Sequence, residues 1–128
     1  MFEANAKIEY TKSVLRAVLS KDFSSYYIKL FKYSEGQEIK VAAPRYFAHV
    51  SIFIPQFHQT EKDLNIYVDK IVKINYSPLE IYKGGRTFVG YYLPIYSEDI
   101  EKIRDEIGVE NNYENRLHLC IFNNKAFL

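Results

Sequence analysis

Cysteine, tryptophan, proline and glycine are all scarce in this sequence. Its 128 residues include one cysteine, Cys120, no tryptophan, four prolines and five glycines. A single cysteine excludes an intramolecular disulfide and favours a reducing compartment. No low-complexity segment and no interdomain linker interrupts the chain, so we expect a single domain over residues 1–128.

Excess charge and long apolar runs are also lacking. Seventeen basic residues against sixteen acidic ones give a formal net charge of +1, which gives no reason to expect duplex DNA or an acidic membrane as a partner. No apolar run approaches the roughly 20 residues of a membrane span, and the N-terminus lacks an apolar signal core. We therefore expect a cytoplasmic protein without a membrane partner.

The spacing of apolar residues predicts a mixture of helices and strands. Helices are expected over residues 3–19, from a cap at Thr60 and Asp63 to a break at Ser77-Pro78, and from Ser97 to Gly108. Strands are expected around the histidines at 49 and 118 and at the following ranges: 24–33, 38–42, and a hairpin of 79–83 with 87–95 around Gly84-Gly85.

Two short strand-like runs carry the main functional clue. Each places a histidine two residues before a small side chain with a donor: His49-Val50-Ser51 and His118-Leu119-Cys120. Because successive side chains of a strand point to opposite faces, His49 shares a face with Ser51, and His118 shares one with Cys120. The intervening Val50 and Leu119 suit a buried sheet surface.

This pattern suits acid–base catalysis at a phosphate. Near neutral pH one imidazole can take a proton from the attacking oxygen while another gives a proton to the leaving oxygen. The Ser51 hydroxyl can then donate to a non-bridging oxygen, where charge builds in the transition state. The Cys120 thiol suits that position less well, because a thiol is a weak donor.

Three other interpretations of the same residues remain open. Both histidines can be ordinary packing residues. His49, His118 and Cys120 can bind zinc with a water in the fourth position, although neither histidine has a carboxylate at a usual ligand spacing. Cys120 can act as a nucleophile beside His118, although nothing there predicts a positive helix terminus. Among the chemical readings we favour catalysis without a metal or another cofactor.

Several further residues are candidates for substrate binding. Arg116 stands two residues before His118 and can clamp a phosphate through its planar guanidinium. His58, in the loop after the first motif, is expected to be a surface residue. The aromatic candidates for stacking a nucleobase flank the motifs or lie in the hairpin, where parity lets only one of two adjacent tyrosines face the site; they are Phe47, Tyr91, Tyr92 and Tyr113.

The two histidine motifs and the order of elements between them resemble the 2H phosphoesterase superfamily, the LigT-like or 2′-5′ RNA ligase-like fold. That family carries two His-x-Thr/Ser motifs. His49-Val50-Ser51 matches the first, whereas His118-Leu119-Cys120 departs at its third position. The resemblance spans about residues 26–122. It implies an α+β fold of two lobes, with two small antiparallel sheets facing each other across a central cleft and helices outside.

The resemblance also implies metal-independent phosphodiesterase chemistry, with His49 and His118 as general acid and base. Within the family, the sequence looks most like the phage anti-CBASS nucleases in its size, in the separation of its motifs and in an amino-acid composition typical of AT-rich coding sequence. Those enzymes degrade cyclic di- and trinucleotide immune signals in the host cytoplasm. The expected ligand is thus a cyclic or short, for example 2′-5′-linked, oligonucleotide. The alternatives are a 2′,3′-cyclic phosphodiesterase in RNA end processing and a lapsed enzyme that sequesters a nucleotide.

Overall fold

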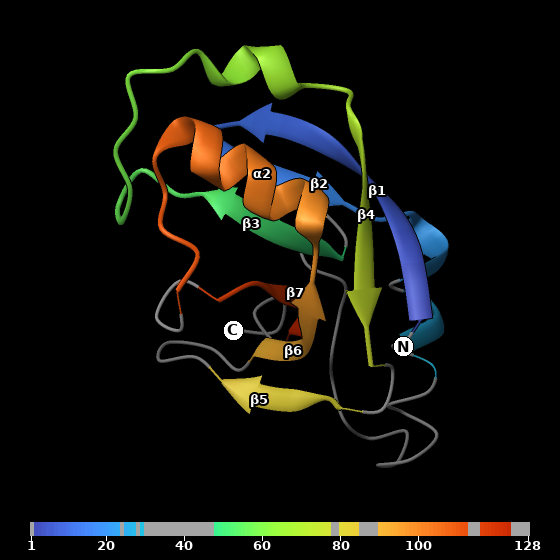
Figure 1. Ribbon diagram of the computed structural model, residues 1–128. Helices are drawn as coiled ribbons and strands as arrows, with labels where there is room; N and C mark the ends of the chain where they lie inside the picture. The colour runs from blue at the N-terminus through green and yellow to red at the C-terminus, as the bar shows by residue number, and fades with distance from the viewer. Residues whose placement is uncertain are drawn as a thin grey trace.

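Seven strands of one antiparallel sheet form the framework of the computed structural model (Figure 1). The described residues are 2–23, 25–27, 29, 48–77, 80–84, 90–112 and 116–123. The strands are β1 (Phe2–Thr11), β2 (Val14–Val18), β3 (His49–Phe53), β4 (Ile71–Tyr76), β5 (Tyr82–Gly84), β6 (Gly90–Tyr96) and β7 (His118–Asn123).

The sheet closes on itself. Its order is β4-β1-β2-β3-β7-β6-β5, and β4 also pairs with β6 through Asn75↔Tyr96 and Tyr76↔Ile95. Six of the described strands therefore form a closed antiparallel barrel, with β5 paired to the first half of β6. The expected α+β fold of two lobes, with two sheets facing each other across a cleft, is wrong, because all the described strands belong to a single sheet.

The predicted helix over residues 3–19 is also wrong. The segment is the hairpin of β1 and β2, with pairs from Lys7↔Val18 to Thr11↔Val14. Its turn residues Lys12 and Ser13 have φ of 52° and 66°. Glycine and asparagine are the residues that usually adopt such positive values in hairpin turns. The buried apolar residues of the two strands alternate along each strand, at Ala6 and Ile8 in β1 and at Leu15 and Ala17 in β2.

The helix expected after Asp63 is reduced to a single 3₁₀ turn, η1 (Leu64–Tyr67). Asp63 does cap it, because its Oδ1 accepts from the Asn65 N–H at 3.0 Å. The turn stops before Asp69, whose φ is 70°, and β4 follows with Val72, Ile74 and Tyr76 buried. The predicted strand over 24–33 is wrong at residues 25–27, which are helical, and the strand predicted over 38–42 lies outside the described residues.

Several predicted elements are confirmed. Strands β3 and β7 carry the two histidine motifs. Strands β5 and β6 form the predicted hairpin, whose tip at 85–89 lies outside the described residues. Helix α2 (Glu98–Ile107) begins after Ser97, whose Oγ accepts from the Ile100 N–H, and ends at Gly108 in the left-handed conformation.

Helix α2 lies against β3 and β4 (Figure 1) and is tied to β4 at its N-terminus. Ser97 Oγ donates to the carbonyl of Lys73 at 2.7 Å, and Asp99 Oδ2 accepts from the N–H of the same residue at 2.9 Å. The helix buries its Ile100, Ile103 and Ile107 side chains in the same apolar cluster as the inward-facing strand residues. This anchoring fixes where the rest of α2 lies against β3.

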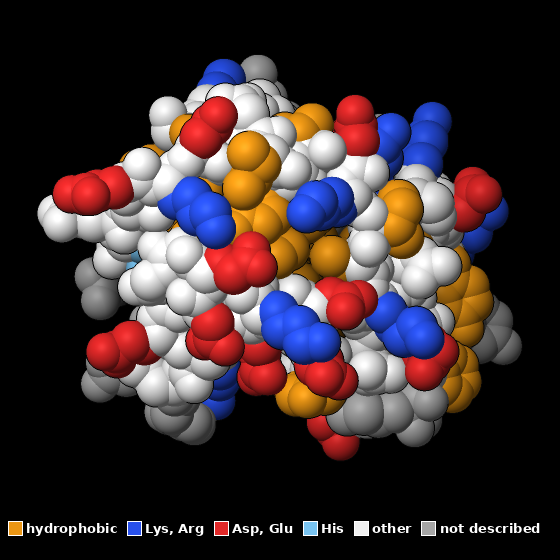
Figure 2. Space-filling model, turned by 45° about the horizontal axis from the view of Figure 1, so that its top comes forward, with side chains coloured by type: hydrophobic (Ala, Val, Ile, Leu, Met, Phe, Trp, Pro, Cys, Tyr) orange, Lys and Arg blue, Asp and Glu red, His pale blue; other side chains and the backbone are white. Residues whose placement is uncertain are grey.

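The outer surface carries charges of both signs. Figure 2 shows Lys and Arg side chains mixed with Asp and Glu around a small apolar area. Exposed ion pairs such as Lys62–Glu106 at 3.8 Å and Lys102–Glu98 at 3.5 Å contribute little stability. Within the described part of the chain, none of the helices has the length and apolar character to cross a bilayer.

Candidate functional site

The two histidine motifs lie on neighbouring strands, in register with each other. Strand β3 pairs with β7 through His49↔Cys120 and Val50↔Leu119. One further step in the same register places Ser51 opposite His118. Directly opposed residues of an antiparallel pair share a face, so both motifs present their polar residues on one face, while Val50 and Leu119 are fully buried on the other.

The register brings His49 and His118 close together. Each histidine is opposite the small residue of the other motif, so the two histidines are diagonal neighbours across the strand pair. Diagonal neighbours of this kind are roughly 7–8 Å apart at the backbone. Two imidazoles at that spacing can contact the same phosphate from two sides. The two histidines are therefore neighbours on adjacent strands of one sheet, but of the two only His118 lines the cavity that opens on this face.

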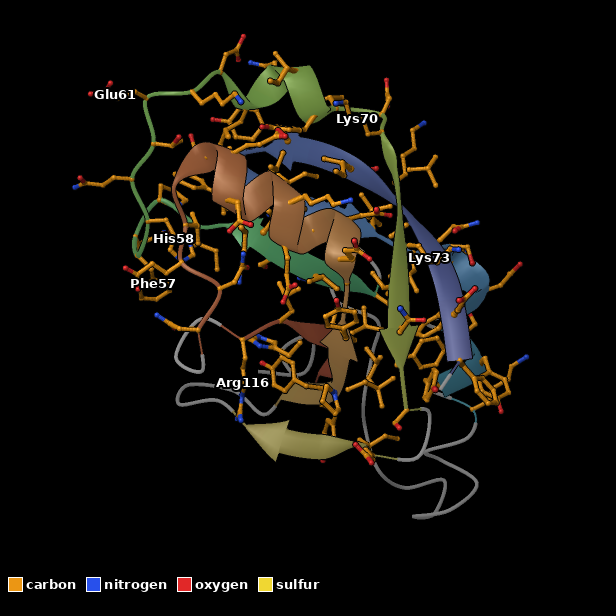
Figure 3. The ribbon with its side chains drawn as sticks, viewed as in Figure 1. Phe57, His58, Glu61, Lys70, Lys73 and Arg116 are labelled. Atoms are coloured by element: carbon orange, nitrogen blue, oxygen red, sulfur yellow. The ribbon has the colours of Figure 1, made fainter. Side chains whose placement is uncertain are left out.

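A cavity of about 420 Å³ opens on this face. His118 and Ser51 form part of its wall, together with two arginines, Arg104 and Arg116. The loop after β3 completes the described lining with Ile54, Phe57 and His58. Figure 3 shows Phe57, His58 and Arg116 on the same side of the molecule. A pocket with two guanidinium groups, imidazoles and a hydroxyl is chemically suited to an anion such as a phosphodiester.

The surroundings of His118 favour its neutral form. Burial lowers the pKa of His118; a hydrogen bond with the Arg116 main chain raises it in part, and the positive charges of Arg104 and Arg116 lower it further. By its solvent-accessible surface, however, His118 is exposed. An imidazole that is neutral and reachable from the cavity at neutral pH is suited to accept a proton, as a general base does.

Arg104 is a functional candidate that the sequence reading missed. It is 4% exposed, and its guanidinium donates to the carbonyl of Ile52 at 3.0 Å and to that of Ser51 at 3.2 Å. Burial lowers its pKa and nearby Glu101 raises it, but an arginine keeps its charge at neutral pH. The available signal was its position on the apolar stripe of α2, four residues after Ile100.

Arg16 is a second missed cation. It lies on β2 directly opposite Ser51 and is 5% exposed. The row Arg16, Ser51, His118 therefore crosses three adjacent strands on one face. No signal in the sequence pointed to Arg16, because the pairing that places it there depends on the hairpin that was predicted as a helix.

Cys120 lies in this face but has little reactivity of its own. Burial raises the pKa of its thiol to about 12, so the group stays a protonated thiol at neutral pH. A thiol in this state is a poor nucleophile and a poor metal ligand. No group of three or more His, Cys, Asp and Glu side chains within the described residues is arranged to hold a metal ion. The zinc and thiol-nucleophile interpretations thus gain no support from these residues.

His58 differs from the surface residue that was expected. It is half-buried and lines the cavity. Its ring Nδ1 accepts from the main-chain N–H of Ile54 at 3.0 Å, and its main-chain N–H donates to the Ile54 carbonyl at 2.9 Å. Its ring centroid lies 5.8 Å from that of Phe53. The loop position after a strand gave no indication of this inward contact.

The aromatic candidates separate by face. Tyr92 lies opposite Cys120, and its ring meets that of His118 edge to face at 5.0 Å. Tyr91 is partly buried and packs against the core. The parity argument therefore selects Tyr92 for the site. Arg116 is exposed and lines the cavity as expected, whereas Phe47 and Tyr113 lie outside the described residues.

Comparisons with protein families, with curated proteins and with solved structures found no match to this chain.

Proposed function

We propose that this protein is a metal-independent phosphodiesterase that acts on a short or cyclic oligonucleotide. The observation that carries the proposal is the in-register pairing of the two motifs, which sets His49 and His118 diagonally across one polar face. The two-histidine chemistry expected from the 2H resemblance needs two imidazoles close to one phosphate and does not need a lobed architecture.

In the proposed reaction His118 is the general base, because its surroundings favour the neutral imidazole. It takes a proton from a water molecule as the water oxygen bonds to phosphorus. His49, as an imidazolium, donates a proton to the leaving oxygen as the P–O bond breaks. Arg104, Arg116 and the Ser51 hydroxyl lie where they would stabilise the charge on the non-bridging oxygens.

For the substrate we favour cyclic di- and trinucleotides, which are the substrates of the anti-CBASS nucleases. The protein would encounter them in the cytoplasm of the host cell. The 2′,3′-cyclic ends of RNA offer the same reacting phosphate. A binding protein without turnover is the second candidate, and one observation favours it: the thiol of Cys120, protonated and weakly donating, stands where the first motif has a hydroxyl.

A substrate panel tests the proposal. The wild-type protein is incubated with cyclic dinucleotides, cyclic trinucleotides, a 2′-5′-linked dinucleotide and an RNA with a 2′,3′-cyclic phosphate end, each with and without EDTA. Products are separated by chromatography. Turnover that survives EDTA and is lost in His118→Asn, but not in the surface control Lys102→Gln, supports the proposal. Tight binding without turnover favours the sequestering protein, and loss of turnover in EDTA overturns the metal-independent mechanism.

A further inference from the structure

The loop that follows β3 presents an exposed aromatic ring at the histidine cavity. Phe57 is 77% exposed, the largest exposure among the large hydrophobic side chains that the structure describes as exposed. It lines the cavity with His118 and Arg116. A phenylalanine this exposed contributes little to the core, and it lies beside an imidazole and a guanidinium group that suit a phosphate.

The loop is held in a fixed shape. The carbonyl of Ile54 accepts from the N–H of Phe57 at 3.0 Å and from that of His58 at 2.9 Å. The N–H of Ile54 donates to Nδ1 of His58 at 3.0 Å. Pro55 restricts the backbone within the same turn. Three hydrogen bonds thus hold the loop closed, and the His58 ring supports the Phe57 ring edge to face at 6.5 Å.

We propose that residues 54–58 form a nucleobase subsite, in which the Phe57 ring stacks on the base next to the phosphate held in the histidine cavity. This inference rests on the proposed function and names the part of the substrate that the cavity does not hold. Base–aromatic stacking tolerates any base, because each has a π face. The subsite therefore recognises an oligonucleotide with little sequence preference, and purines bind more tightly than pyrimidines.

His58 acts in this subsite as a positioning residue. Its Nδ1 accepts the Ile54 N–H, so substitution by asparagine, whose side-chain oxygen can accept the same bond, keeps the loop closed, whereas alanine removes the acceptor. Binding of an oligonucleotide is therefore expected to weaken in His58→Ala and to be restored in His58→Asn. A loss in both variants would show that the ring itself, and not its hydrogen bond, is needed.

The test measures binding separately from turnover. A dinucleotide with 2-aminopurine at one position and a phosphorothioate linkage is titrated with protein, and stacking quenches its fluorescence. Phe57→Leu is expected to weaken binding about 10-fold and to remove the quenching, while Phe57→Trp retains both. The control is Phe2→Leu, which removes another exposed aromatic on β1, at the opposite end of the molecule from this loop (Figure 1).

A second ligand separates this inference from the proposed function. The same phosphodiester with an abasic position in place of 2-aminopurine is expected to bind equally to wild type and Phe57→Leu. Hydrolysis of oligonucleotides with no Phe57 dependence of binding would overturn the subsite and leave the hydrolase standing. Quenching that depends on Phe57 without any hydrolysis would leave the subsite standing and overturn the hydrolase, and failure of the dinucleotide to bind would overturn the subsite.

Discussion

Cys120 lies directly opposite His49 on the neighbouring antiparallel strand, at the position where the first motif has the Ser51 hydroxyl. Cys120 is half-buried, and loss of solvation raises the pKa of its thiol to about 12. The histidine of one strand thus faces a weak donor, while His118, two positions further along the register, faces a strong one. The two motifs thus differ in the group at their third position, a thiol in one and a hydroxyl in the other.

Substitution of Cys120 by threonine is expected to increase turnover. A hydroxyl in place of the thiol supplies a stronger hydrogen bond to a phosphate oxygen, and a gain of about 1 kcal/mol in the transition state corresponds to roughly a 5-fold higher kcat. The measurement is kcat for the best substrate of the panel. Cys120→Ala is the matched control, with no donor at all, and is expected not to exceed wild type. An unchanged rate in Cys120→Thr would remove Cys120 from the phosphate.

The charge of Arg116 is expected to set the acidic limb of the pH–rate profile. A general base works only when it is neutral, so kcat/KM falls as the pH drops through the pKa of His118. That pKa is lowered by burial and, in part, by the charges of Arg104 and Arg116, so the limb lies below the ordinary histidine value. Removal of the Arg116 charge in Arg116→Gln makes the imidazolium less unfavourable, raises the pKa and moves the limb to higher pH.

The control for this experiment is Lys102→Gln, which removes an exposed cation from the same region of sequence, paired only with Glu98 at 3.5 Å in the described structure. Its profile is expected to match that of wild type. A limb in Arg116→Gln that stays in place, or moves to lower pH, would contradict the assignment of His118 as the base.

Arg104 is expected to stabilise the fold through its hydrogen bonds to β3, in addition to supplying a positive charge to the site. Its guanidinium donates to the carbonyls of both Ile52 and Ser51. Replacement in Arg104→Met keeps much of the volume but removes these donors, so the free energy of unfolding in urea should fall by about 1–3 kcal/mol. The exposed neighbour in Lys102→Met should change it by less than about 0.5 kcal/mol. Equal stability of the two variants would contradict a structural role for the Arg104 bonds.

The sequence predicted the strands that carry the motifs, because a histidine and a small polar residue alternate there with apolar residues that prove to be buried, such as Val50 and Leu119. It also predicted α2, where Ser97 and Gly108 are ordinary cap residues. These are local sequence preferences, and they predict the structure correctly where tertiary packing favours the same conformation.

The errors came from segments in which local signals were ambiguous. The hairpin of β1 and β2 turns at Lys12 and Ser13, neither of which predicts a turn with positive φ. Its small inward residues, Ala6 and Ala17, contribute little to a hydrophobic pattern, so the larger apolar residues suggested a helical spacing instead. Around η1, apolar residues at helical spacing belong in fact to a 3₁₀ turn and the start of β4.

The remainder of the site depends on pairing between distant strands, which no local pattern contains. The sequence could show that His49 and Ser51 share a face, but not that β7 is the neighbour of β3 or that Arg16 faces Ser51 from β2. A fold of two lobes was expected because the motifs and the order of elements between them resemble the 2H phosphoesterases. In the structure the two motif strands instead pair directly with each other, within one sheet that closes through β4 and β6.

If His49 and His118 act on one phosphate, their substitutions must be coupled, and a double-mutant cycle measures that coupling. The measurement is kcat/KM in wild type, His49→Ala, His118→Ala and the double variant. Each single substitution is expected to lower kcat/KM by roughly 100- to 10,000-fold. The double variant should be little worse than either single one, because residues that act as a unit are not additive. Activity that survives His49→Ala, or two losses that simply multiply, would contradict the claim.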